Sequence, residues 1–95
     1  MTITEFENLK EKKNPLILKF KADWCTPCKQ LDPILQEIEQ SHNIQIIEVD
    51  VEESVDLCER MNIKKLPTIQ YFQNGEFIDE KKGITTKKVI EDMIT

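Results

Sequence analysis

The chain has 95 residues, with 13 Lys or Arg and 18 Asp or Glu, and a formal net charge of −5. This length predicts one domain over residues 1–95 with a single hydrophobic core. The negative charge argues against nucleic acid or an anionic membrane as a partner. The apolar runs are too short for a signal peptide or a membrane span, so we expect a cytoplasmic protein.

The first half of the chain alternates between helical and strand-like patterns. Thr4 and Glu7 match a capping box, which predicts a first helix that ends before the break at Asn14 and Pro15. Residues 16–20 are a predicted strand, and residues 28–40 repeat apolar positions at helical spacing. Pro33 lies inside that helix and should bend it without ending it, because the apolar period continues on both sides.

The second half continues this alternation. Residues 44–49 are a predicted strand, and residues 54–61 are a short helix with the apolar positions Val55, Leu57, Cys58 and Met61. Residues 68–72 and 76–78 flank Asn74-Gly75, a pair typical of a type I′ hairpin turn. Residues 86–94 form a last helix, with these side chains facing inward: Val89, Ile90 and Met93. The order α-β-α-β-α-β-β-α predicts an α/β fold, with parallel strands, one antiparallel edge strand and helices on both faces.

Two cysteines stand at the start of the long central helix, in the sequence Trp24-Cys25-Thr26-Pro27-Cys28. If the helix begins at or just after Cys25, then Cys28 lies one turn later on the same face, close enough for a disulfide. The unpaired N–H groups at a helix N-terminus stabilise a thiolate and lower the pKa of a cysteine there below the usual value of about 8.5. This pattern indicates a redox site.

These residues also carry a family resemblance. The cysteine motif, Pro33 in the following helix, Leu66-Pro67-Thr68 before a strand and Asn74-Gly75 in a hairpin together resemble thioredoxin over nearly the whole chain. The resemblance implies a thioredoxin-like three-layer α/β/α sandwich, with a mixed sheet of four to five strands.

The resemblance also implies the roles of individual residues. Cys25 would be the attacking nucleophile and Cys28 the resolving thiol, and Pro67 would be a cis-proline facing the disulfide. The implied substrate-binding residues are Trp24, Thr26, Pro27, Lys65, Leu66, Pro67, Gly83 and Ile84. The implied activity is reduction of protein disulfides through a mixed disulfide. A separate thioredoxin-reductase-type enzyme would regenerate the dithiol, because the chain has no dinucleotide fingerprint, and we expect a monomer without a cofactor.

Three positions depart from the family pattern. Thr26 stands where glycine is common, and the family's first strand is either missing or reduced to Ile3 and its neighbours. Lys19 stands where the family carries a buried aspartate that relays protons. We expect Glu48 on the next predicted strand to face it, and we hypothesise an inverted Lys19/Glu48 charge pair that favours the thiolate. The alternative is that Lys19 simply reaches solvent.

The sequence is also compatible with other functions. The chain is short of ligands for a structural zinc site, since only Cys58 and His42 accompany the motif. A non-catalytic adaptor or assembly subunit is a second alternative, and a more oxidising disulfide oxidase or isomerase is a third. We expect Cys58 to be a small buried hydrophobic residue and His42 to be a solvated loop residue.

Overall fold

The computed structural model describes residues 1–95 as four helices and four strands. In chain order these are α1 (Ile3–Glu11), β1 (Leu16–Lys21), α2 (Thr26–His42), β2 (Gln45–Asp50), α3 (Val55–Arg60), β3 (Thr68–Gln73), β4 (Glu76–Lys82) and α4 (Lys87–Ile94). The predicted order of elements is confirmed. The helix α2 continues through Pro33, as its apolar period indicated.

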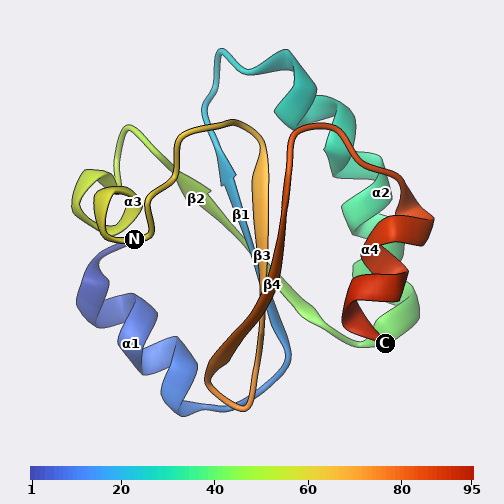
Figure 1. Cartoon of the computed structure of the whole chain (residues 1–95), viewed down its shortest axis with the longest axis horizontal. Helices are drawn as coiled ribbons and strands as arrows, with labels where there is room; N and C mark the ends of the chain where they lie inside the picture. Colours follow the sequence, from blue (N-terminus) through green and yellow to red (C-terminus); the bar gives the residue numbers. More distant parts are fainter.

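The strands form one mixed sheet in the order β2-β1-β3-β4. β1 and β2 are parallel, whereas β3 runs antiparallel to both β1 and β4. Figure 1 shows α1 and α3 on one side of the sheet and α2 and α4 on the other, which confirms the three-layer α/β/α architecture. Ile3 lies in α1, so the chain forms no strand there and β2 is an edge of the sheet.

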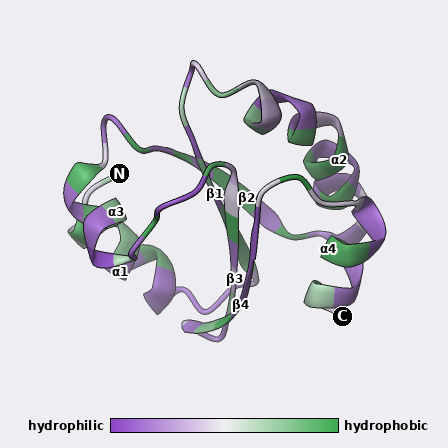
Figure 2. Cartoon of the chain, turned by 45° about the horizontal axis from the view of Figure 1, so that its top comes forward, coloured by the Kyte–Doolittle hydropathy of each residue, from purple (hydrophilic) through white to green (hydrophobic).

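Alternation along the strands produces a hydrophobic core on each face of the sheet. Leu18 and Phe20 pack toward α1 and α3, whereas Ile17 packs toward α2 and α4. Figure 2 shows α2 and α4 as alternating hydrophobic and hydrophilic bands, as expected of helices with one buried face. No helix combines the length and the apolar character needed to cross a membrane.

Two details of the predicted helices are wrong. The first helix begins at Ile3, and its capping box joins Thr2 to Glu5 rather than Thr4 to Glu7. The earlier start lets the apolar N-terminal residues pack against the core cluster on this face. Val89 was expected to face inward, but it is 39% exposed, because the buried stripe of α4 is narrower than its apolar pattern. Val55, an apolar position of α3, is also exposed, at 51%.

The hairpin is longer than predicted. β4 extends to Lys82, because its backbone pairs with the whole of β3. The residues after Ile78 are charged, so the apolar pattern did not reveal this part of the strand. The turn residues Asn74 and Gly75 both have positive φ, as the predicted type I′ turn requires. A Cβ on Gly75 would lie 2.8 Å from the carbonyl oxygen of Lys10, so the turn also packs tightly against the end of α1.

Candidate active site

The two motif cysteines form a disulfide at the N-terminus of α2. Cys25 is the N-cap residue, and Cys28 lies in the first turn of the helix. The Cα atoms of the two cysteines are 5.3 Å apart. The Cys28 N–H donates a hydrogen bond of 3.2 Å to Cys25 Sγ. Pro27 occupies a first-turn position, where its missing N–H has no helical partner to lose. The Cys25 sulfur therefore lies where backbone N–H groups stabilise a thiolate.

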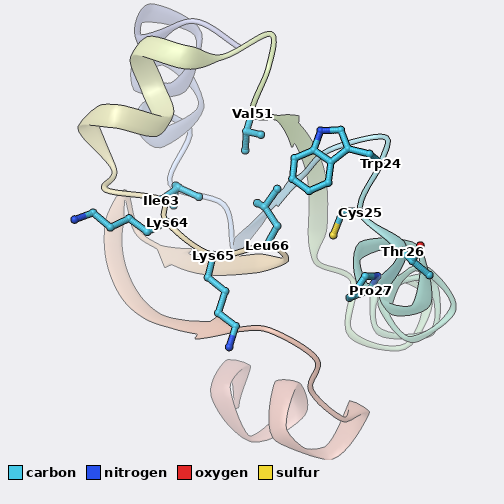
Figure 3. Close-up of a pocket in the computed structure, with 9 residues that line it drawn as sticks. All are labelled: Trp24, Cys25, Thr26, Pro27, Val51, Ile63, Lys64, Lys65 and Leu66. Atoms are coloured by element: carbon cyan, nitrogen blue, oxygen red, sulfur yellow. The ribbon is translucent and has the colours of Figure 1, made fainter.

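A surface groove of about 550 Å³ lies beside the disulfide. Its lining residues come from the cysteine turn, the end of β2 and the loop before β3: Trp24, Cys25, Thr26, Pro27, Val51, Ile63, Lys64, Lys65 and Leu66. In Figure 3 the Cys25 sulfur lies between the Trp24 ring and Pro27, and Leu66 faces it across the groove. Cys28 is 1% exposed and does not line the groove, so a partner in the groove meets Cys25 first.

Trp24 lies at one edge of this groove, beside the carboxylates of Asp23 and Glu52. The indole is 69% exposed, and its Nε1 donates a hydrogen bond of 3.1 Å to a carboxylate oxygen of Glu52. A hydrogen bond of 2.9 Å from Lys21 holds the pKa of Asp23 below its usual value. Trp24 thus presents an apolar ring to solvent while its polar edge is already occupied.

The loop before β3 supplies the opposite wall. The Leu66–Pro67 peptide bond is cis, as the resemblance implied, and the Pro67 carbonyl accepts a hydrogen bond of 2.7 Å from the Gly83 N–H. Pro67 is buried, and Ile84 is 68% exposed. Gly83 and Ile84 do not line the groove, although Gly83 packs beside the Lys65 side chain.

The Leu66 backbone is free to bind a partner. Leu66 lies outside the strands, and neither its N–H nor its C=O forms a hydrogen bond within the chain. Because its side chain also faces the groove, this residue offers an unpaired donor and an unpaired acceptor next to the disulfide. An extended segment can pair with such groups as an added strand does.

The hypothesised Lys19/Glu48 charge pair is not formed. The two residues are partners in the β1–β2 register, but the Lys19 ammonium pairs with Asp32 on α2. Glu48 is 53% exposed at its side chain and lies 3.9 Å from Lys21. Lys19 is only 2% exposed, so the alternative that it reaches solvent is also wrong. The long lysine stem reaches the helix packed above the strand, which strand register alone does not reveal.

Cys58 and His42, the two other residues considered in the sequence, do not line the groove. Cys58 is 8% exposed in α3, as expected of a small buried residue, and burial raises the pKa of its thiol. His42 was expected to be a solvated loop residue, which is wrong. It is the last residue of α2, and its Nε2 lies 2.8 Å from a carboxylate oxygen of Glu91 on α4.

Sequence reasoning missed four residues near the disulfide. Val51, Ile63 and Lys64 line the groove, and Asp32 pairs with Lys19. Val51 directly follows a strand that runs parallel to β1, so its place at the carboxyl end of the sheet was a usable signal. The position of Asp32, four residues after Cys28 on one helix, was a second such signal.

Comparison with known proteins gives a consistent result. The thioredoxin family model matches residues 1–95. The thioredoxin of Rickettsia typhi is 35% identical over 97 residues, covering 99% of this chain and 92% of that protein. Thioredoxin-1 of Caenorhabditis elegans is 36% identical over 83 residues, covering 84% and 72%. The crystal structure of oxidised mitochondrial thioredoxin 3 from Saccharomyces cerevisiae superposes with a TM-score of 0.91 at 30% identity, covering 98% of this chain and 88% of the other.

Proposed function

Because the chain belongs to the thioredoxin family and is a thiol–disulfide oxidoreductase acting through Cys25 and Cys28, we propose that it works as a cytoplasmic reductant of protein disulfides. Proline before the second cysteine resembles the reducing members of the family rather than its oxidants. The cysteine usage supports a reducing compartment, since the third cysteine, Cys58, is a buried free thiol.

The order of steps that we propose rests on the place of the two cysteines, because only Cys25 lines the groove. Cys25 lines the groove, so its thiolate attacks the target disulfide and forms a mixed disulfide, releasing one target sulfur as a thiolate. Cys28, buried behind it, then attacks Cys25 Sγ and releases the second target sulfur. The target ends as a dithiol and this protein ends as the disulfide.

The shape and charge of the groove favour some protein disulfides over others. An extended segment pairs with the free backbone groups of Leu66 and lays an apolar side chain between Trp24 and Ile63. Lys64 and Lys65 stand at the rim without an ion-pair partner, in a chain of net charge −5. We therefore assign disulfides flanked by acidic residues as the preferred targets.

We also propose how the dithiol is regenerated and that the protein is a monomer. A separate reductase returns the Cys25–Cys28 disulfide to the dithiol, as for thioredoxins in general, and it approaches the same groove. The protein acts as a monomer, since one chain holds both sulfurs and the whole groove. Light scattering on the purified protein checks the mass, and a stable dimer would contradict this part.

The decisive experiment is equilibration of the dithiol with glutathione, together with an insulin-reduction assay. A reductant should give a potential near about −270 mV and should precipitate insulin in the presence of dithiothreitol. A potential near about −180 to −120 mV would instead show an oxidase or isomerase. Replacing both Cys25 and Cys28 with Ser should abolish turnover, and retained insulin reduction would overturn the assignment of the site.

A further inference from the structure

One charged side chain lies in the interior of this protein. Lys19 is 2% exposed on β1, and the other buried polar residues are uncharged. It shares the strand face of Ile17, beneath α2, where its ammonium pairs with Asp32. Removing an ammonium ion from water costs several kcal/mol even when it is paired. A buried charge of this kind on the strand that leads into the reactive cysteines is therefore a candidate for a role in the chemistry.

The partner of Lys19 lies one helical turn from the buried cysteine. Asp32 follows Cys28 by four residues on α2, a spacing that places two side chains side by side with Cβ atoms about 5–6 Å apart. The β2 carboxylates on this side of the sheet, Glu48 and Asp50, both lie near Lys21, at 3.9 Å and 3.6 Å. Glu37 and Glu39 lie more than two turns beyond Cys28 on α2, and Glu91 on α4 pairs with His42. Tyr71 on β3 is buried among apolar residues. Asp32 is thus the carboxylate placed to serve Cys28.

Asp32 also has its own access to water. It lines a mostly polar cavity of about 230 Å³ together with Lys19, Gln36, Glu39 and Glu48. This cavity shares no lining residue with the groove beside Cys25. A bound target therefore covers the groove without closing the path between Asp32 and solvent.

We propose that Asp32, which pairs with the Lys19 ammonium, takes the proton of the Cys28 thiol when Cys28 resolves the mixed disulfide. The proton passes from Cys28 Sγ to Asp32, directly or through one water molecule, as Cys28 Sγ bonds to Cys25 Sγ. The bond between Cys25 and the target breaks, and its electron pair leaves with the target thiolate. Asp32 then returns the proton to water through the cavity, so the step needs no other reactant.

The test separates the two steps of the reaction. Attack by Cys25 on a disulfide peptide is timed in a Cys28→Ser background, and resolution is timed in the full dithiol protein by acid quench and mass spectrometry of the mixed disulfide. The main variant is Lys19→Met with Asp32→Leu, which removes both charges and leaves none unpaired. Asp32→Asn is a second variant, and circular dichroism checks that each one folds.

We expect resolution at pH 7 to slow about 100-fold in the double variant, within the usual range for loss of a general base. Its rate should then rise with pH toward about 8.5, because the thiolate must form unaided. Attack by Cys25 should stay within about twofold. The matched control Glu37→Gln removes a carboxylate of the same helix that pairs with Lys87, and it should resolve like the parent.

Other results would overturn the proposal. Resolution within about threefold of the parent in the double variant would remove Asp32 from the step. Equal slowing of attack and resolution would indicate a structural role for the pair. Failure of Cys25 to attack the peptide in the Cys28→Ser protein would instead contradict the proposed order of steps, which keeps the two outcomes distinct.

Discussion

The ion pair between Lys19 and Asp32 predicts an asymmetry in stability. Its two members differ in exposure: the Lys19 side chain is 2% exposed, whereas the Asp32 side chain is 42% exposed. Asp32→Asn leaves a buried ammonium without its counter-charge, which costs about 3–5 kcal/mol of unfolding free energy. Lys19→Met leaves a carboxylate that water hydrates and fills the space of the lysine stem, so the change should stay within about 1 kcal/mol.

Urea denaturation of the oxidised protein measures this difference. For a domain of this size, with a slope of about 1–1.5 kcal/mol per M, loss of 3 kcal/mol lowers the midpoint by about 2–3 M. Keeping the disulfide closed in every variant removes any effect of the redox state. The exposed pair Lys88–Asp92 supplies the control, since Lys88→Met should cost less than about 0.5 kcal/mol.

One result would refute this reasoning. If Lys19→Met destabilised the protein as much as Asp32→Asn, the buried ammonium would not be the source of the cost. The pair would then contribute through packing of the lysine stem. The double variant gives an independent check, because combining Lys19→Met with Asp32→Leu should recover most of the loss seen in Asp32→Asn.

Three further predictions concern the groove, the free thiol and the turns. Charge reversal at Lys64 and Lys65 should lower kcat/KM for an acid-flanked disulfide peptide about three- to tenfold at low salt, with a smaller effect at high salt. Iodoacetamide should modify Cys58 slowly at pH 7.5 until urea unfolds the chain, since burial raises the pKa of its thiol. Gly75→Ala should destabilise more than Gly83→Ala, because a new Cβ meets a backbone oxygen in the first case and a flexible lysine in the second.

Each of these predictions has a matched comparison. Reversal of Lys12 and Lys13, which follow α1, should leave kcat/KM for the acidic peptide unchanged, and an equal loss would show a general charge effect. Fast modification of Cys58 in the folded protein would contradict its burial. Equal unfolding free energies for the two alanine variants would show that the contact with the Lys10 carbonyl does not matter.

The sequence predicted the fold well where apolar periodicity was strong. β1 alternates between two cores and α2 keeps one buried stripe, so both were found with small errors at their ends. β4 was predicted too short because an edge strand bears polar side chains while its backbone pairs with β3. Its length depends on that neighbour rather than on its own hydrophobic pattern.

For the site, the sequence predicted which residues meet at the groove but not the contacts of two long side chains. Cys25, Trp24 and Leu66 meet at one groove because their positions follow from a local motif and from the ends of elements. The contacts of Lys19 and His42 were mistaken because each joins α2 to another element through a long side chain. Such contacts depend on how a helix lies over a sheet or beside another helix, which a linear pattern does not encode.

The open edge of the sheet has a practical consequence. β2 pairs with β1 alone, so its outer N–H and C=O groups form no ladder with a further strand. An extended peptide fused or added in trans has a template there for a fifth strand. The acidic residues Glu48 and Asp50 on β2 oppose self-association of identical chains at this edge and favour a guest strand rich in lysine. This border therefore offers a place for attaching a label or an affinity segment away from the reactive sulfurs.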